Sequence, residues 1–282
     1  MNCNSYYKKP NLLVHNITVI YKNGHLAVRD VSFNLNGGLI YALVGINGSG
    51  KSTIFKTIMG LIKPVRGYVK LNNYSINKAI KHNIISYVPQ TEDIDWDFPV
   101  LVYDVVMMGR YGKMGFLRIP TKKDKQIVSL SLKKVGLNNL KERQIGELSG
   151  GQKKRVFIAR ALAQEGKVLL LDEPFTGIDV KTENSIIQIL LELRKMGYLI
   201  LVSTHNLGSI PQFCDQIILV NQTILNIGPV STTFTKENLK LAFGNTLRHI
   251  DILNTDLDHN NFNSLSIVTD DEKAAVFYKY KK

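Results

Sequence analysis

Hydrophobic residues that alternate with polar ones mark two strands near the start of the chain. Val14–Tyr21 alternates imperfectly and is rich in β-branched residues. Val31–Leu35 repeats this pattern before Asn36-Gly37-Gly38 interrupts it. The pattern predicts two antiparallel strands.

Continuous apolar runs that alternate with helical spacing predict a second, parallel sheet. Leu39–Val44 is uninterrupted and ends in a glycine-rich turn, and helical periodicity follows over Ser52–Ile62 until Pro64. The same alternation returns later as strand, amphipathic helix and strand, over Val168–Leu171, Glu183–Met196 and Leu199–Ser203. Strands and helices in this order are typical of an α/β protein whose strands run parallel.

Two other regions lack this alternation. Thr91–Ala163 is mainly helical in pattern, with Gly and Pro interruptions, and predicts an inserted helical subdomain. Beyond about Val230 the chain is rich in Asn and Lys, and Ser266–Val268 with Ala274–Tyr278 is expected to form a terminal hairpin. We therefore expect one domain over residues 12–230, with its helical subdomain at about 91–163, and an extension over 231–282 of unassigned role.

Composition places the chain among ordinary globular proteins. Its 282 residues are 44% hydrophobic and 21% charged, enough to bury a substantial core. The longest nearly apolar run, Leu39–Ile46, is far shorter than the roughly 20 residues that a membrane-spanning helix needs. Lys8-Lys9-Pro10 interrupts the stretch where a signal peptide would be apolar, and Cys3 and Cys214 show no paired spacing. We expect a location in the reducing cytosol.

Basic residues outnumber acidic ones 36 to 23, which gives a net charge of +13. Such a charge favours nucleic acid or an anionic membrane surface as a neighbour. The basic residues are spread along the chain, with clusters at Lys122-Lys123 and Lys153-Lys154-Arg155 and at the end of the chain. We favour a solvated basic surface over a dedicated polyanion site.

Candidate chemistry begins directly after Leu39–Val44. Residues 45–52 read Gly-Ile-Asn-Gly-Ser-Gly-Lys-Ser and match the G-x-x-x-x-G-K-[ST] phosphate loop, between a predicted strand and a predicted helix. Glycines let backbone N–H groups surround phosphate oxygens, Lys51 can reach the β- and γ-phosphates, and Ser52 is suited to hold Mg²⁺. This context disfavours a simple glycine turn with an exposed lysine. The predicted nucleotide-binding residues of this segment are Gly45, Asn47, Gly48, Ser49, Gly50, Lys51, Ser52 and Thr53.

Two acids follow the predicted strand Val168–Leu171. Asp172 and Glu173 stand at its carboxyl end, the edge at which open α/β sheets bind ligands. Asp172 is expected to bind Mg²⁺ through water, and Glu173 to polarise the attacking water as the catalytic base. Alone, these acids would merely end a strand before Pro174, but the phosphate loop favours the catalytic interpretation.

The sequence Leu148-Ser149-Gly150-Gly151-Gln152 has two compatible interpretations. Ser149, with Gln152 three residues later, forms a capping box at the start of a helix. An exposed helix N-terminus fronted by Ser and two Gly is also a second phosphate-binding surface, too far along the chain to belong to the first loop.

Together, these motifs resemble the nucleotide-binding subunit of ATP-binding cassette (ABC) transporters, because the Leu-Ser-Gly-Gly-Gln signature separates that family from other proteins with the phosphate loop. The resemblance covers nearly the whole chain to about residue 230. It implies an α/β P-loop NTPase (RecA-like) core sheet with an antiparallel β subdomain and an inserted helical signature subdomain. It also implies Mg²⁺-dependent ATP hydrolysis by a head-to-tail homodimer, in which each phosphate loop faces the signature Ser149–Gln152 of the other copy, with Ser149 and Gly151 at the contact.

Four further positions match the family. The resemblance implies that Tyr21 stacks on the adenine and that Gln90 senses Mg²⁺. It also implies that Asp179 links the two nucleotide sites and that His205 contacts the γ-phosphate. Each has a structural alternative: strand packing for Tyr21, a turn after Pro89 for Gln90, a helix cap for Asp179 and a capping loop for His205. Their joint presence, in the order that the family requires, favours the functional interpretation. Gln90 and His205 are then expected to be catalytic residues in addition to Glu173.

Two segments resemble the subgroup that serves manganese, iron and zinc importers. Residues 90–99 read Gln-Thr-Glu-Asp-Ile-Asp-Trp-Asp-Phe-Pro, and Phe175–Ile178 departs from the commoner Ser-Ala-Leu lead-in to Asp179. Ala242-Phe243-Gly244 and Thr269-Asp270-Asp271-Glu272 resemble the manganese/iron branch. We do not expect the acids at 92, 93, 95 and 97 to bind metal, because the family places that segment near the permease's cytoplasmic coupling helix.

The resemblance implies a peripheral subunit on the cytoplasmic face of the inner membrane. Its partners would be a second copy, an integral membrane permease and, through the permease, a metal-binding substrate protein. Alternatives are a zinc importer, a soluble cassette ATPase acting on nucleic acid or cofactor assembly, and a regulatory module without turnover. Many nucleic-acid members carry two fused cassettes whereas this chain has one, and regulatory modules usually lose the glutamate or histidine that stand here as Glu173 and His205. We expect no direct binding of nucleic acid.

Overall fold

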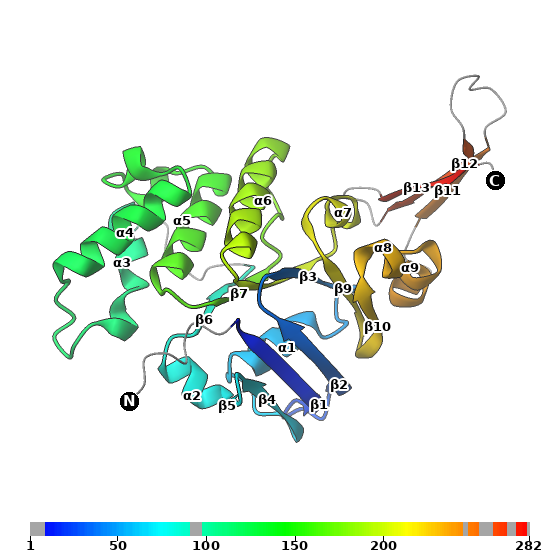
Figure 1. The fold of residues 1–282 in the computed structure, drawn as a ribbon, viewed down its shortest axis with the longest axis horizontal. Coiled ribbons are helices and arrows are strands. Elements are labelled where there is room, and N and C mark those ends of the chain that lie inside the picture. Colours follow the sequence, from blue (N-terminus) through cyan, green and yellow to red (C-terminus); the bar gives the residue numbers. More distant parts are fainter. Residues whose placement is uncertain (1–8, 91–97, 245–247, 254–261, 270–274, 281–282) are drawn as a thin grey trace.

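A six-stranded sheet runs through the centre of the fold, with helices on both faces (Figure 1). The computed structural model describes residues 9–90, 98–244, 248–253, 262–269 and 275–280. The strand order is β10-β9-β3-β8-β7-β6, in which β10 is antiparallel to β9 and all other neighbours are parallel. The strands are β3 (Leu39–Val44), β6 (Ile85–Val88), β7 (Val168–Asp172), β8 (Leu199–Thr204), β9 (Gln216–Asn221) and β10 (Thr223–Pro229). The predicted parallel sheet is confirmed.

The two strands predicted at the start of the chain belong to a separate antiparallel sheet, with the order β2-β1-β4-β5. Its strands are β1 (Asn11–Ile20), β2 (Leu26–Asn36), β4 (Arg66–Leu71) and β5 (Tyr74–Ser75). The pairing of β1 with β2 confirms the prediction, but both strands begin earlier than predicted. Asn16 and Asp30 adopt positive φ angles of 46° and 48° where the register shifts. The irregularity at Asp30 interrupts the alternation directly before Val31, where β2 was predicted to begin.

Helix ends are set by local capping. The helix after the phosphate loop, α1 (Lys51–Ile58), ends four residues earlier than predicted because Gly60 follows with a φ of 67°. The later helix α6 (Val180–Lys195) begins before the predicted Glu183, because the Asp179 side chain caps it. The other helices and 3₁₀ turns outside the helical subdomain are α2 (Ile76–Lys81), η5 (Leu207–Ser209), α7 (Ile210–Phe213), α8 (Val230–Thr233) and α9 (Lys236–Phe243).

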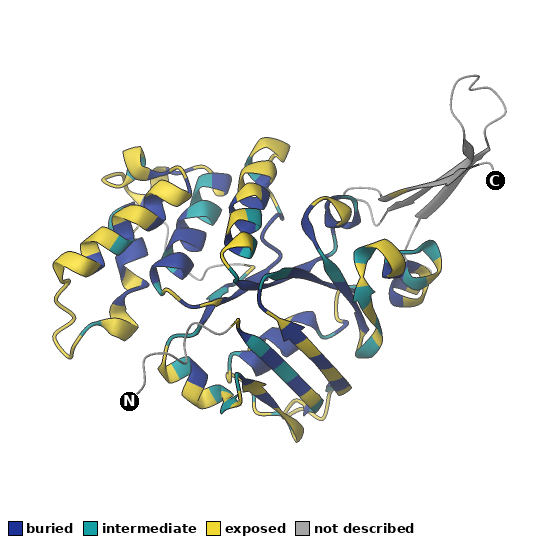
Figure 2. Ribbon diagram, in the orientation of Figure 1, coloured by how far each residue is buried: buried dark blue, intermediate teal, exposed yellow. Residues whose placement is uncertain are grey.

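The central sheet separates two apolar cores. In β7, Val168 and Leu170 pack into the core shared with α1 and the antiparallel sheet, whereas Leu169 and Leu171 pack into the core shared with the helical subdomain and α6. Figure 2 shows the central strands buried along most of their length. Because successive side chains of a strand face opposite sides and both sides are covered, these strands read as continuous apolar runs.

The helical subdomain is inserted between β6 and β7, as predicted. Its elements are α3 (Val102–Met108), η2 (Tyr111–Lys113), α4 (Lys122–Lys134), η3 (Asn138–Leu140), η4 (Ile145–Glu147) and α5 (Gly150–Ala163). Residues 91–97 of the predicted range lie outside the described residues. Along the part of the chain that the structure describes, we find no helix with the length and apolar character required to span a bilayer.

The end of the chain forms a third sheet, in which β12 lies between β11 and β13. Its antiparallel strands are β11 (Arg248–Leu253), β12 (Phe262–Thr269) and β13 (Ala275–Tyr280). Pairing of β12 with β13 confirms the predicted hairpin, while β11 was not predicted. Leu239, Ala242 and Phe243 of α9 are buried in the same core as β9, beyond residue 230. The division of the chain at that residue stays a prediction.

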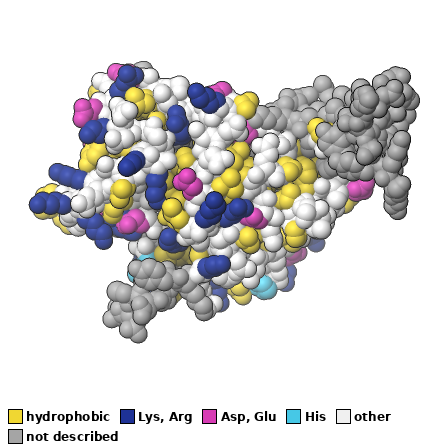
Figure 3. All heavy atoms as spheres, turned by 45° about the horizontal axis from the view of Figure 1, so that its top comes forward, with side chains coloured by type: hydrophobic (Ala, Val, Ile, Leu, Met, Phe, Trp, Pro, Cys, Tyr) yellow, Lys and Arg dark blue, Asp and Glu magenta, His cyan; other side chains and the backbone are white. Residues whose placement is uncertain are grey.

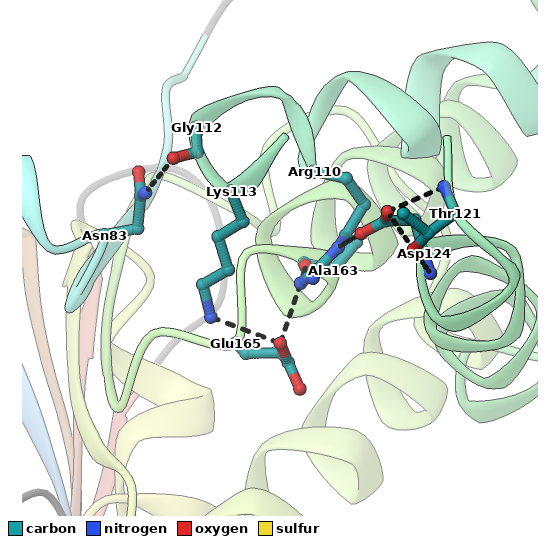
Figure 4. A network of polar contacts seen from close by, with 8 residues as sticks. All are labelled: Asn83, Arg110, Gly112, Lys113, Thr121, Asp124, Ala163 and Glu165. Atoms are coloured by element: carbon teal, nitrogen blue, oxygen red, sulfur yellow. Dashed lines mark hydrogen bonds and ion pairs between the residues drawn. The ribbon is translucent and has the colours of Figure 1, made fainter. Parts of the chain in front are cut away.

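A buried ionic network holds the helical subdomain together (Figure 4). The Arg110 side chain donates from Nε to Asp124 Oδ1 at 2.9 Å, and from Nη1 to the Ala163 carbonyl at 2.7 Å and Glu165 Oε2 at 2.8 Å. Asp124 Oδ2 also accepts hydrogen bonds from the backbone and hydroxyl of Thr121, at 2.9 and 2.6 Å. The network joins the residues after α3, the start of α4 and the end of α5.

Replacing Asp124 by Asn is expected to lower the free energy of unfolding by about 2 kcal/mol at pH 7, because the substitution leaves Arg110 buried with a weaker partner. The pKa of Asp124 is lowered from 3.8 to about 2, chiefly by the hydrogen bonds from Thr121 and also by Arg110. A depressed folded pKa stabilises the protein above about pH 4, and this contribution is lost as the pH falls toward 2. Urea unfolding at pH 7 and at pH 3 measures both effects. The exposed Asp104→Asn is the control, and an equal loss at the two pH values would contradict the linkage.

Candidate functional site

The phosphate loop connects β3 to α1, and its glycines are required by close packing. A Cβ at Gly45 would lie 2.1 Å from the Val220 carbonyl oxygen, and one at Gly50 would lie 2.3 Å from Val28 Cγ1. Gly50 also adopts a φ of 99° and caps α1 with no side-chain hydrogen bond. The loop can therefore turn tightly into the helix, and the first N–H groups of α1 remain available for an anion.

Lys51 and Ser49 lie inward within this loop. The Lys51 side chain is 6% exposed, and Nζ donates to the carbonyls of Gly45 and Ile46 at 2.7 and 3.0 Å. Ser49 is 1% exposed, and its Oγ has no hydrogen-bond partner among the described residues. The ammonium group is thus held at the centre of the loop by backbone acceptors, where a phosphate oxygen can replace them.

A pocket of about 210 Å³ opens above the loop. It is lined by Tyr21, His25, Ala27, Asn47, Gly48, Gly50, Lys51, Ser52, Thr53, Gln90, Asp172 and Glu173. Ten of these were predicted from the sequence, whereas His25 and Ala27 were not. Gly45 and Ser49, also predicted, do not line the pocket.

Tyr21 forms one wall of this pocket. Its hydroxyl lies 2.9 Å from Thr53 Oγ1, and its ring is stacked with the His25 ring at a centroid distance of 6.3 Å and an interplanar angle of 10°. Tyr21 is 37% exposed, so its ring is accessible to a flat partner.

The two acids are buried, and each is fixed by β8. Asp172 and Glu173 are 4% and 5% exposed. The Ser203 hydroxyl donates a short hydrogen bond to Asp172 Oδ1, and the Glu173 N–H is directed at the same hydroxyl and at the Ser203 carbonyl, at 3.0 and 3.2 Å. Tyr87 donates weakly to Asp172 Oδ2 at 3.4 Å. Sequence reasoning missed Ser203, although it ends the predicted strand Leu199–Ser203.

The backbone of Glu173 is strained. Its φ of 50° lies in the left-handed region, which costs energy for a residue with a side chain. His205 Nδ1 lies 2.9 Å from Glu173 Oε2. The carboxylate therefore lies beside a neighbouring imidazole at the carboxyl edge of the sheet, an arrangement suited to accept a proton from water.

The pocket offers the oxygen donors that Mg²⁺ prefers. Ser52 supplies a hydroxyl, Gln90 an amide oxygen and Asp172 a carboxylate, and all three line the same cavity as Lys51. These donors fit a hard divalent cation beside a polyphosphate, and the Mg²⁺ ligand set from the sequence stays a prediction.

The signature segment and Asp179 lie outside this pocket. Ser149 and Gln152 form the predicted capping box, with N–H···O distances of 2.9 and 3.3 Å. Asp179 caps α6 by accepting from the Thr182 N–H and hydroxyl at 2.9 and 2.7 Å, and these bonds lower the pKa of Asp179. The structure does not bring these residues to the phosphate loop of their own chain.

One polar contact links α5 to the pocket. Lys154 Nζ donates to the Gln90 carbonyl oxygen at 2.6 Å. The two residues are 64 positions apart, and nothing in the sequence signalled the pairing. The bond ties the helix that begins with the signature to a residue that lines the pocket.

Comparisons with known proteins agree with these motifs. The ABC transporter family model matches residues 28–176. The chain is 63% identical to the chelated iron transport system membrane protein YfeB of Yersinia pestis, over 98% of this chain and 94% of that protein. It is 57% identical to the manganese transport system ATP-binding protein MntA of Synechocystis sp., over 83% and 90% respectively.

Solved structures give the same result. The structure of a metal-chelate type ABC transporter in an inward-facing conformation matches with a TM-score of 0.76 and 27% identity, over 93% of this chain and 97% of that chain. Its fold agrees with the α/β core, the antiparallel sheet and the inserted helices described above. From its phosphate loop, its paired acids, its signature segment and these identities, the chain belongs to the ABC transporter family.

Proposed function

We propose that this chain is the ATP-hydrolysing subunit of an importer for manganese or iron ions, acting as a homodimer on a membrane permease. The observation that carries the proposal is the single pocket in which Lys51, Asp172 and Glu173 meet. A cation for phosphates, a carboxylate for Mg²⁺ and a buried base for water are the parts that phosphoryl transfer to water requires.

ATP would bind with its phosphates on the loop. The N–H groups at the start of α1 and the Lys51 ammonium group bind the β- and γ-phosphates, and Tyr21 stacks on the adenine with His25 packed beside it. Ser52, Gln90 and Asp172 would hold Mg²⁺, which neutralises developing phosphate charge when it is bound.

Glu173 would take the proton of the attacking water. Its side chain is buried, with Oε2 2.9 Å from His205 Nδ1, and its backbone N–H donates to Ser203. Little conformational freedom remains to be lost when water and the γ-phosphate meet, and positioning supplies most of the rate enhancement in this chemistry. His205 does not line the pocket itself but lies against Glu173, which does, and from there it would contact the γ-phosphate.

A second copy would complete the site. Ser149, Gly150, Gly151 and Gln152 and the linking acid Asp179 do not line the pocket of their own chain. A head-to-tail dimer would bring the signature of each copy over the phosphate loop of the other. The N-terminus of α5, with no acid in its first turn, is suited to a γ-phosphate.

The cargo and the cellular location rest on the relatives. The relatives that are 63% and 57% identical are named for iron and manganese, whereas one named for zinc is 38% identical, which favours iron and manganese. Such a subunit would sit peripherally on the cytoplasmic face of the inner membrane, with a metal-binding substrate protein reaching it through the permease. A soluble ATPase acting on nucleic acid or cofactor assembly would use the same pocket and stays the alternative, which the net charge of +13 allows. Recovery with membranes on cell fractionation separates the two.

Lys51→Ala is expected to abolish nucleotide binding and, in cells under metal limitation, to lower cellular manganese or iron selectively. Elemental mass spectrometry of cells that carry the variant in place of the native protein measures the change. Lys56→Ala, an exposed position on α1, is the control. A fall in cellular zinc alone would assign zinc as the cargo. Unchanged cellular metal contents, with an active native ATPase, would favour the soluble alternative.

Glu173→Gln is expected to bind ATP, to accumulate as a closed dimer and to hydrolyse ATP at least about 100-fold more slowly, because the amide cannot accept the proton. Size-exclusion chromatography with ATP and a phosphate-release assay measure the two effects. The exposed Glu192→Gln on α6 is the control. Rapid turnover by Glu173→Gln would remove Glu173 as the base.

Ser203→Ala is expected to lower the free energy of unfolding by about 2 kcal/mol, because it removes the hydrogen-bond partner of a buried carboxylate and of a buried N–H. Hydrolysis should fall as well, since both acids lose a constraint. Chemical denaturation and steady-state ATPase assays test this, with the exposed Ser185→Ala on α6 as the control. A stable variant with native turnover would show that β8 does not position the acids.

A further inference from the structure

The connection between η2 and α4 exposes three large apolar side chains. Phe116, Leu117 and Ile119 are 100%, 76% and 68% exposed, and we call these three residues the apolar tip. Figure 1 places this connection at the left-hand end of the helical subdomain, remote from the central sheet, and Figure 2 shows it as exposed. Single apolar residues are common on protein surfaces, but three exposed ones within four positions form a contiguous patch, which is typical of an interaction site.

Basic residues surround the apolar tip. Lys113 precedes it, Arg118 lies within it, and Lys122, Lys123 and Lys125 occupy the first turn of α4. Between residues 111 and 125 the sequence has one acid, Asp124, whose carboxylate is 4% exposed and bound to Arg110 and Thr121. Figure 3 shows Lys and Arg side chains gathered around hydrophobic ones at this end of the molecule. The surface at the tip is therefore both apolar and strongly cationic.

Both ends of the connection are anchored, so the tip is presented on a firm base. On one side, the Asn83 amide donates to the Gly112 carbonyl at 3.0 Å, and Lys113 pairs with Glu165 at 3.2 Å (Figure 4). On the other side, Thr121 and Asp124 form the capping box that starts α4. The apolar residues between these anchors project outward and do not fold back on the subdomain.

We propose that the apolar tip inserts into the interfacial region of an anionic lipid bilayer. Phe116, Leu117 and Ile119 would enter the boundary between headgroups and acyl chains, while Arg118 and the α4 lysines would bind lipid phosphates. A hydrophobic cluster flanked by lysine and arginine is the combination that binds anionic membrane surfaces, and neither component alone holds a protein firmly. The inference rests on the proposed function for its setting, because the tip meets a bilayer only if the subunit works at a membrane.

A bilayer fits this surface better than a protein partner does. The tip is a projecting loop whose central phenylalanine is fully exposed, a shape that enters a soft interface readily. Its charge is of one sign, which matches the uniform negative charge of an anionic leaflet. Docking on a protein is an alternative that the experiment must separate.

The experiment uses the purified full-length protein and two kinds of vesicle, phosphatidylcholine alone and phosphatidylcholine with phosphatidylglycerol. Flotation should recover the protein with the anionic vesicles, less at high salt, and little with the neutral ones. A double variant, Phe116→Ser with Leu117→Ser, should reduce partitioning at least about tenfold. Leu61→Ser, which alters a side chain as exposed as Ile119 at 68%, should leave partitioning unchanged.

Fluorescence reports insertion directly. In Phe116→Trp, the emission of the new tryptophan should shift to the blue on addition of anionic vesicles, after subtraction of the native protein's signal, which contains Trp96 alone. A tryptophan that stays in water, or native partitioning of the double variant, would overturn the proposal. A further outcome is that the native protein binds only vesicles that contain the permease, with the double variant failing to bind them. That result would assign the tip to a protein partner and would overturn the proposal equally.

ATP hydrolysis in solution separates this inference from the proposed function. The double variant should have the same unfolding temperature as the native protein and hydrolyse ATP at the same rate, because the tip lies outside the nucleotide pocket. Native ATPase activity without vesicle binding would overturn the lipid contact alone. An inactive native protein would count against the proposed function whatever the tip binds.

Discussion

The parallel pairing of β7 with β8 fixes the edge of the sheet at which the proposed catalytic groups lie. Asp172 lies in register with Ser203, so the acids that follow β7 and the histidine that follows β8 emerge beside each other. Ser203 then binds the carboxylate of one acid and the backbone of the next, which holds Glu173 in its left-handed conformation. A register slip of one residue would turn these groups to opposite faces of the sheet. The chemistry thus depends on burial of β7 and β8 on both sides, since those cores enforce the register.

A hydrogen bond from Lys154 ties the helical subdomain to the pocket at this edge. The Arg110 network joins its helices into one unit, and Lys154 connects α5 to Gln90, which lines the pocket. A displacement of the subdomain would consequently move Gln90, the proposed Mg²⁺ ligand, and the signature together. The same unit carries the apolar tip at its far end, so contact with a membrane would restrain the body that carries the signature.

Local patterns predicted most of what local forces determine. The phosphate loop, the acids at Asp172 and Glu173 and the capping box at Ser149 depend on neighbouring residues, and ten predicted residues meet in one pocket. Ser203 and Lys154 were missed because their contacts depend on tertiary packing and join residues 31 and 64 positions apart. His25 was missed although its contact with Tyr21 is only four positions away, because a single histidine after a predicted strand carries no signal of its own. Strand bounds failed where backbone irregularities hid the alternation. The functional roles of the site residues, including Tyr21 and His205, stay predictions that geometry supports.

The charge at helix N-termini separates the helices suited to phosphate from the rest. Among described helices of at least eight residues, α4, α6 and α9 carry an acid in the first turn, whereas α1 and α5 carry none. An acid there neutralises the positive end of the helix dipole and competes with an anion for the free N–H groups. At the N-terminus of α6, the Asp179 carboxylate accepts a hydrogen bond from the Thr182 N–H, so a negative charge already lies where an anion would bind. The two helices without such an acid are α1, which follows the phosphate loop, and α5, which begins with the signature. In the proposed dimer, the N-terminus of α5 would act on the nucleotide bound by the other copy.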